Sequence, residues 1–203
     1  MRVLVGCEYS GVVREEFASR GHDAWSCDLL ETEEPGQHFQ CDVLDVLDQG
    51  WDLAIFHPDC TYLTNSGVHH LYRPNQEEPV AKGVPRWKRL HSAAMFFNKL
   101  KDCEIPKICI ENPIPHCYAK NMIGKYTQLI QPWQHGHSET KATCLWLKGL
   151  PNLPETNNVK SEMMKLPKKE RSRVHYASPK ADRWKDRSRT LPGIAKAMAD
   201  TWG

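Results

Sequence analysis

The feature that most constrains the fold is a short apolar run that ends in a proline turn. No polar side chain interrupts Leu53 to Phe56, and His57-Pro58-Asp59-Cys60 follows directly. A continuous apolar run of this length is typical of a parallel strand that is covered on both faces. Open α/β sheets bind their ligands in the crevice beyond the carboxyl ends of such strands. The turn therefore places the Cys60 thiol where a nucleophile could act.

The same pattern recurs about fifty residues later. Lys107-Ile108-Cys109-Ile110 is a second apolar strand, and Glu111-Asn112-Pro113 follows it. One strand end thus offers a thiol and another offers a carboxylate beside an amide. Taken together, the two motifs predict a site that contains Cys60, Glu111 and Asn112.

The remaining segments alternate between strand and helix patterns. Strands are expected at 2–6, 23–28, 127–131 and 142–147, a short strand or loop at 38–42, a helical turn at 43–47, and helices at 12–20, 87–100 and 192–201. In the first helix, Val13 and Phe17 form the apolar side and Arg14 belongs to the polar side. The alternation predicts an α/β fold with a doubly wound, mostly parallel sheet, in one domain of residues 1–203. Residues 61–86 form a long connection, which in a compact domain is typical of a lid, a binding loop or a disordered segment.

Charge and cysteine usage narrow the class of protein. The formal charge is +2, but residues 160–189 hold eleven basic and four acidic residues. This asymmetry favours a basic face for a polyanion, with a solvated surface as the alternative. There are eight cysteines without a C-x-x-C pair, no signal-peptide pattern, and no apolar stretch near the ~18 residues of a membrane helix. These features predict a cytoplasmic protein with reduced thiols. His57, Cys60, His69 and His70 match no structural zinc spacing, so no metal is expected.

The N-terminal segment has the pattern of a nucleoside-binding turn. Val5-Gly6-Cys7-Glu8-Tyr9-Ser10-Gly11 runs from a strand through a small-residue turn into a helix start. Asp28 ends the next strand and can bind ribose hydroxyls, and Asp42 can accept from an adenine amino group. Because the charge of Glu8 would repel a pyrophosphate, a cofactor without phosphates fits better, which favours S-adenosylmethionine over NAD. Alternatively, the two aspartates only cap turns.

In this order the motifs resemble those of the cytosine-C5 DNA methyltransferases, in particular short phage- and prophage-type members. Leu4 to Gly11 is similar to the first motif of that family, Pro58-Asp59-Cys60 to its Pro-Pro-Cys, and Glu111-Asn112-Pro113 to its Glu-Asn-Val. The nearest match to its Gln-x-Arg-x-Arg motif is Glu139-Thr140-Lys141-Ala142-Thr143, in which only Lys141 keeps the basic character. Ser188 to Ala195 is similar to the closing element of the short members, which returns to the cofactor side. Asp59 and Pro113 depart from the pattern.

The resemblance implies a role for each matching residue. Cys60 would be the nucleophile that adds at C6 of cytosine, and Glu111, with a raised pKa, would contact N3 and the exocyclic amine. Asn112 would hold the loop geometry, while Lys141 and Arg189 would bind phosphates or the cofactor carboxylate. S-adenosyl-L-methionine would contact Val5, Gly6, Cys7, Tyr9, Ser10, Gly11, Asp28, Leu29, Asp42, Val43 and Pro58.

The resemblance also implies a DNA substrate with a flipped or single-stranded cytosine. It covers residues 1–147 and 188–203, so 148–187 is a basic insertion and the usual target-recognition domain is reduced or absent. Contact with DNA would then fall to Arg73, Arg86, Lys168, Lys169, Arg171 and Arg173. A bacterial host cytoplasm and a phage or prophage origin are expected.

Three alternatives remain open. One is C5 modification of a free pyrimidine nucleotide or of RNA, which the missing recognition domain favours and the basic segment opposes. Another is a catalytically inactive DNA-binding or anti-restriction relative. An amino-methyltransferase fits less well, because His57-Pro58-Asp59-Cys60 lacks both the leading acid or amide and the aromatic residue of that class.

Overall fold

The architecture is organised by a seven-stranded sheet. The structure is a computed structural model that describes residues 1–71, 86–176 and 188–203. The sheet has the order β3-β2-β1-β4-β5-β7-β6. Its strands are β1 (Arg2–Gly6), β2 (Asp23–Asp28), β3 (His38–Gln40), β4 (Leu53–Phe56), β5 (Lys107–Pro113), β6 (Gln128–Ile130) and β7 (Thr143–Lys148). Strands β1 to β5 pair in parallel, whereas β7 is antiparallel to both β5 and β6. The predicted α/β fold with a mostly parallel sheet is confirmed.

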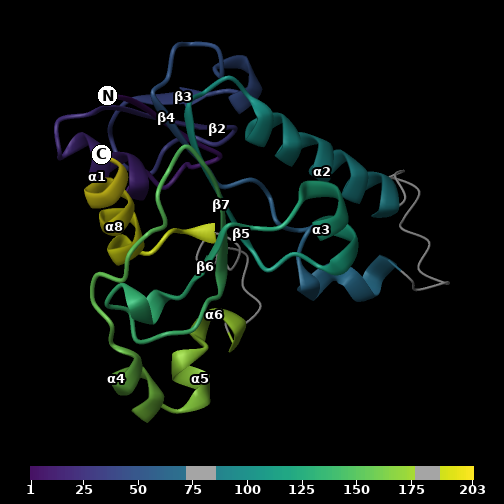
Figure 1. Ribbon diagram of the computed structural model, residues 1–203, viewed down its shortest axis with the longest axis vertical. Coiled ribbons are helices and arrows are strands. Elements are labelled where there is room, and N and C mark those ends of the chain that lie inside the picture. The colour runs from purple at the N-terminus through teal and green to yellow at the C-terminus, as the bar shows by residue number, and fades with distance from the viewer. Residues whose placement is uncertain (72–85, 177–187) are drawn as a thin grey trace.

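Helices cover both faces of the sheet. On one side, α1 (Val12–Ala18) and α8 (Pro192–Trp202) pack over β1 and β4, and on the other lie α2 (Arg86–Asp102) and α3 (Cys117–Ile123) (Figure 1). Each face has its own hydrophobic cluster, and successive residues of β4 alternate between the two clusters. All four residues of β4 are therefore fully buried, which explains its uninterrupted apolar sequence.

The chain reverses its direction across the sheet between β1 and β4. From β1 it moves outward through β2 and β3, and it then crosses back to place β4 on the other side of β1. Gly6 and Phe56 are in register at the carboxyl ends of these strands, and the next amide, of His57, donates to the Gly6 carbonyl at 3.0 Å. Such a switch point opens a crevice beyond the two strand ends.

The segments outside the sheet contain more structure than the sequence pattern indicates. Helix α3 is preceded by a region with no clear periodicity, and its two buried residues, Ala119 and Ile123, give too weak a signal. Within the expected connection 61–86 lies a 3₁₀ helix, η2 (Asn65–Leu71). Two further 3₁₀ turns are η1 (Val43–Asp45) and η4 (Pro132–Gln134).

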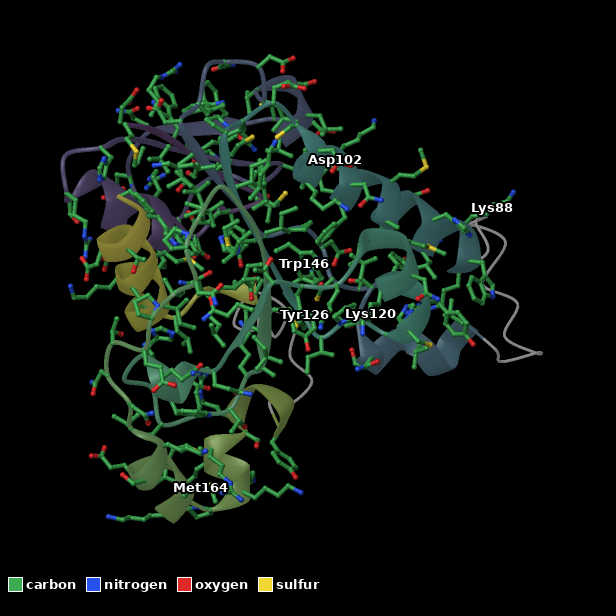
Figure 2. The ribbon with its side chains drawn as sticks, in the orientation of Figure 1. Lys88, Asp102, Lys120, Tyr126, Trp146 and Met164 are labelled. Atoms are coloured by element: carbon green, nitrogen blue, oxygen red, sulfur yellow. The ribbon has the colours of Figure 1, made fainter. Side chains whose placement is uncertain are left out.

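The basic segment also folds into helices. They are α4 (Lys160–Lys165), α5 (Lys168–Arg171) and α6 (Arg173–Tyr176), and they lie beyond the sheet at the end opposite the chain termini (Figure 1). Figure 2 labels the exposed Met164 at this extremity, far from Asp102 and Lys88 at the two ends of α2. The neighbouring Met163 is buried, which anchors α4 to the rest of the molecule.

Arg14 differs from the prediction. We expected its side chain on the polar side of α1, but it is fully buried. Its Nη1 donates to Ser26 Oγ at 2.9 Å and to Thr32 Oγ1 at 3.2 Å, and its Nη2 donates to the carbonyl oxygens of Glu34 and Pro35 at 2.8 and 3.3 Å. These acceptors compensate the guanidinium for the loss of water. Arg14 thereby fixes the loop between β2 and β3.

Among the described helices, none combines the length and the apolar character that crossing a membrane would need.

Candidate active site

Two adjoining cavities lie in the crevice at the ends of β1, β4 and β5. The Cys60 cavity has a volume of about 130 Å³, and its lining includes Cys60, Glu111, Asn112 and Lys141. The Asp28 cavity has a volume of about 400 Å³ and includes Asp28, Leu29, Asp42 and Val43. Both cavities are lined by Cys7, Tyr9, His57, Asp59 and Ser188, so they meet along these residues.

The Cys60 turn is held by the loop that follows β5. The Cys60 carbonyl accepts hydrogen bonds from the amides of Leu63 and Thr64 at 3.1 and 3.2 Å. The His116 amide donates to Leu63, and its ring Nδ1 accepts from the Ala119 amide. Since Nδ1 acts as an acceptor, the proton is on Nε2, which donates to the Tyr62 carbonyl at 3.0 Å. The half-buried Cys60 side chain is therefore carried by a turn fixed to the end of the neighbouring strand.

Asn112 joins the two motifs directly. Its Nδ2 donates to the Pro58 carbonyl at 3.0 Å, and the residue is 1% exposed. Its Oδ1 is buried and accepts no hydrogen bond from the described residues. A buried acceptor of this kind is costly unless a ligand or water satisfies it. Asn112 thus holds the proline turn and also offers an acceptor at the cavity.

Glu111 is paired with His57 at the ends of β5 and β4. Glu111 Oε2 lies 3.4 Å from His57 Nδ1, and both side chains are largely buried. Burial alone would raise the pKa of Glu111, but the hydrogen bond from His57 and the charge of Lys141 outweigh it, so the pKa is lowered. The expected raised pKa is therefore wrong. The carboxylate remains ionised because two cationic or hydrogen-bonding neighbours face it.

His57 is a site residue that the sequence pattern suggested only as a zinc ligand. Its Nε2 is buried without a hydrogen-bond partner among the described residues, and its side chain is 9% exposed. Of the other zinc candidates, the side chains of His69 and His70 lie outside what the structure describes. Over the described part of the chain, no group of three or more potential metal ligands occurs. The signal for His57 was its position directly before the proline of the thiol turn.

Residues 188–190 close one side of the Cys60 cavity. Lys141 Nζ donates to the Arg189 carbonyl at 3.3 Å, and Ser188 Oγ lies 3.3 Å from Tyr9 Oη. The Arg189 guanidinium forms an ion pair with Glu33 in the loop between β2 and β3. The C-terminal segment thus returns to the β1 turn, as the sequence predicted.

The Asp28 cavity has two carboxylates at its rim. Asp28 Oδ1 accepts from the Leu30 amide at 2.9 Å, and Asp42 Oδ1 accepts from the Leu44 amide at 3.0 Å. Each aspartate therefore caps a turn, and a carboxylate keeps further acceptor capacity for a ligand. Burial raises the pKa of Asp28. Leu29 is 73% exposed beside them, so an apolar surface and two acceptors face the same space.

Glu8 fills the N-terminus of α1. Its carboxylate accepts from the amides of Val13 at 2.8 Å and Arg14 at 3.3 Å, and from Ser10 Oγ at 3.1 Å. A helix N-terminus offers free amides and a positive dipole end, which is where nucleotide phosphates bind. Because Glu8 already occupies those amides, this turn does not fit a pyrophosphate.

The other predicted cofactor contacts divide into two groups. Eight of them line a cavity, namely Cys7, Tyr9, Ser10, Asp28, Leu29, Asp42, Val43 and Pro58. Val5, Gly6 and Gly11 line neither cavity. Val5 is buried in the cluster beneath α1 and α8, and a Cβ on Gly6 would lie 2.6 Å from a ring carbon of Phe56. Gly11 has φ 74°, and its small size accommodates the Arg14 guanidinium. The structure gives these three a packing role.

The predicted DNA contacts are not one continuous cationic surface. Arg73 lies outside the described residues. Arg86 stands at the start of α2, with its guanidinium carbon 5.0 Å from the Tyr62 ring centre, close to the Cys60 turn. Arg173 forms an ion pair with Glu139 at 3.2 Å.

On α5 the three predicted DNA contacts differ in their surroundings. Lys168 and Lys169 are exposed, whereas Arg171 is half-buried and its Nη1 donates to Met164 Sδ at 3.2 Å. Among the cations of α5, the two exposed lysines are therefore the ones best placed to meet a polyanion.

Comparison with known proteins gives a likeness of fold. No family model and no curated protein matches the chain. Among solved structures it is similar to a candidate DNA modification methyltransferase encoded within a prophage, from E. coli, at 13% identity and a TM-score of 0.45. That match covers 82% of this chain and 55% of the other. It is also similar to the methyltransferase EhMeth of Entamoeba histolytica, at 13% identity and a TM-score of 0.47, over 78% of this chain and 57% of the other. The chain spans little more than half the length of either protein. We therefore infer function from the site itself.

Proposed function

We propose that this protein transfers a methyl group from S-adenosyl-L-methionine to C5 of cytosine in DNA, through a covalent bond between Cys60 and C6. One observation carries the proposal. The Cys60 thiol and the ionised Glu111 carboxylate share a cavity at two adjacent strand ends, and this cavity opens onto a larger one rimmed by Asp28 and Asp42.

The larger cavity fits the proposed cofactor. Its volume of about 400 Å³ lies within the range of small-molecule sites. Asp28 can accept from ribose hydroxyls, Asp42 from an adenine amine, and Leu29 offers an apolar surface to the adenine ring. Glu8 in the first turn excludes a pyrophosphate, which favours this nucleoside over NAD. When bound, the cofactor supplies an electrophilic methyl group.

The smaller cavity fits the chemistry that C5 requires. C5 of cytosine is too weak a nucleophile to take a methyl group unaided, and thiolate addition at C6 converts the ring into an enamine. Cys60 lines the cavity and is only half-buried, so a cytosine ring in the cavity could reach its thiol. The Glu111 carboxylate can accept from the exocyclic amine and from a protonated N3, which stabilises the protonated ring. Asn112 holds the turn that carries Cys60.

A base paired inside a duplex cannot reach such a cavity, so the target must be flipped out or single-stranded.

The arginines at the start of α2 support a role in DNA binding for the surface beside the Cys60 cavity. Arg86 and Arg89 lie over the Tyr62 ring, two residues beyond Cys60. Phosphates near the flipped nucleotide would meet these cations first. Lys168 and Lys169 on α5 would add contacts farther along the strand.

The test is an analysis of the modified nucleoside. The protein is incubated with S-adenosyl-L-methionine and, in separate reactions, with duplex DNA, single-stranded DNA, RNA or dCMP, and each product is digested and analysed by mass spectrometry. We expect 5-methylcytosine in DNA, and its loss in Cys60→Ala and Glu111→Gln. Cys117→Ala is the matched control, because Cys117 is an exposed thiol on α3, away from both cavities.

Other products would point to the alternatives. N4-methylcytosine or N6-methyladenine would identify an amino-methyltransferase and overturn the proposal. 5-Methylcytosine in RNA or dCMP alone would keep the C5 chemistry and reject DNA as the substrate. DNA binding without any methylated product would identify an inactive relative.

A further inference from the structure

His57 lies where the two cavities meet, and its role goes beyond the proposed function. The ring belongs to the lining of both the Cys60 and Asp28 cavities. A methyl group that passes from a donor in the larger cavity to a base in the smaller one must cross this boundary. The C5 carbon that receives it must therefore come close to the residues that both cavities share.

We propose that His57 Nε2 is the base that removes the C5 proton after methyl transfer. The inference rests on the proposed function and adds a catalytic residue to it. Nδ1 faces the Glu111 carboxylate at 3.4 Å, and Nε2 is buried without a hydrogen-bond partner among the described residues. A carboxylate facing Nδ1 favours the tautomer with the proton on that nitrogen, which leaves the Nε2 lone pair free to accept. The same arrangement orients the histidine base in hydrolase triads.

The other residues shared by the cavities are less suited to this role. Tyr9 is paired with Ser188 through their hydroxyls, and a protonated hydroxyl is a poor base. Cys7 has a buried thiol whose pKa burial raises, so it stays protonated. Asp59 is exposed, and its Oδ1 accepts from both the amide and the hydroxyl of Thr61. Among these shared residues, His57 is the one that combines burial, an orienting carboxylate and an acceptor nitrogen without a partner among the described residues.

The step balances in atoms and electrons. The Cys60 thiol would lose its proton to solvent as its sulfur bonds to C6, and the C5–C6 π pair would then take the methyl group of the sulfonium donor, whose departing pair would stay on the donor sulfur. His57 Nε2 then takes the proton from C5. The C5–H electron pair re-forms the C5–C6 double bond, and the C6–S pair returns to Cys60. Glu111 stabilises the imidazolium until solvent removes the proton.

The test separates proton removal from adduct formation. Release of tritium, without cofactor, from DNA tritiated at C5 of cytosine requires removal of a hydron at C5. Adduct formation with 5-fluorocytosine DNA and cofactor does not, because fluorine cannot leave as a proton would. For His57→Gln we expect tritium release to fall about 100-fold or more, as for loss of a general base, while the fluorocytosine adduct forms within about threefold of the wild-type rate. With ordinary cytosine and cofactor, this variant should also accumulate a denaturation-resistant adduct.

Controls make each outcome decisive. His91→Gln is the matched variant, because His91 is exposed on α2, and melting curves check the fold of each protein. If His57→Gln slows adduct formation as much as tritium release, His57 only positions the turn and the inference fails while the proposed function stands. Tritium release at the wild-type rate, or its loss in Asp59→Asn instead, also overturns it. A wild-type protein that neither forms an adduct nor releases tritium would overturn the proposed function and the inference with it.

Discussion

Replacing Arg14 by methionine should destabilise the protein and loosen the cofactor side of the site. Methionine keeps much of the volume and the helix propensity of arginine but cannot donate hydrogen bonds. The guanidinium is fully buried and bonds to four acceptors in β2 and the following loop. That loop also carries Glu33, the ion-pair partner of Arg189. The substitution therefore disturbs both the loop and the C-terminal segment that closes the Cys60 cavity.

The magnitude follows from the fate of each acceptor. Hydrogen bonds to charged groups contribute about 1.5–3 kcal/mol each and are not additive, and an unsatisfied buried acceptor costs about 1–3 kcal/mol. The carbonyls of Glu34 and Pro35 lie in a surface loop and can turn to water, whereas Ser26 keeps His38 as a partner and Thr32 keeps the Glu34 carbonyl. Arg14 Nε also forms an ion pair with Glu15 at 2.9 Å, and that exposed carboxylate can be hydrated when the pair is lost. Relief from burying a charge offsets part of the destabilisation. We expect a net decrease in stability of about 3 kcal/mol, which lowers Tm by roughly 6–12 °C in a chain of this size.

The assay is thermal unfolding followed by circular dichroism, with Arg20→Met as the matched control. Arg20 is a half-buried surface arginine two residues beyond the end of α1, paired with Glu16 and Asp200. Surface pairs contribute about 0–1 kcal/mol each, so removing these two should lower Tm by no more than about 8 °C and, at the median value of such pairs, by much less than in Arg14→Met. Equal Tm values for the two variants would refute the reasoning, because Arg14 would then stabilise the fold no more than a surface ion pair.

Three further predictions concern the cofactor, pH and DNA. S-adenosylhomocysteine should raise Tm by roughly 5–11 °C at 100 times its Kd, Asp28→Ala should reduce that rise, and a response to NAD alone would contradict the cofactor assignment. Burial lowers the pKa of His137, whose Nε2 accepts from the Gly193 amide at 2.9 Å. As the pH falls, His137 is therefore protonated in the unfolded chain before it is protonated in the folded one. The free energy that the neutral, buried His137 contributes to stability is fully present above the ordinary pKa of 6.5 and is lost as the pH falls through that value. Tm measured between pH 7.5 and 5.5 should fall less in His137→Gln than in the wild type, and parallel curves would reject this. The double variant Lys168→Ala with Lys169→Ala should bind all DNA sequences about equally more weakly. The slope of log K against log salt concentration should become shallower by up to about one unit for each phosphate that is no longer neutralised. An unchanged slope would show that α5 is not part of the DNA-binding surface.

The strands and the two strand-end motifs could be predicted because their signals are local. An uninterrupted apolar run reports burial on both faces, and the polar residues and proline that follow it report that the strand end is near. The strand β5 nevertheless continues through Glu111 and Asn112 to Pro113, beyond the predicted end. The burial of Arg14 could not be predicted in this way. Its acceptors are contributed by another strand and a loop up to 21 residues away, and helical periodicity assigns a charged residue to solvent.

The electrostatics of the site depended on tertiary contacts in the same way. The expectation of a raised pKa for Glu111 rested on the burial of the carboxyl group in a cleft, and burial does act in that direction. The register of β4 and β5 brings His57 beside the carboxylate, and the approach to β7 brings Lys141. Their combined effect exceeds that of burial. Similarly, the sequence assigns Arg173 to contact with DNA, but in the fold its guanidinium is paired with Glu139.

The most direct measurement of the central claim is to locate the covalent bond. The protein is incubated with S-adenosyl-L-methionine and an oligonucleotide containing 5-fluorocytosine, the denaturation-resistant complex is digested, and the modified peptide is sequenced by mass spectrometry. The proposed mechanism predicts a methylated 5-fluorocytosine attached through C6 to the sulfur of Cys60. Absence of any adduct from a folded protein that binds the cofactor, or attachment to Cys7 instead, would contradict it.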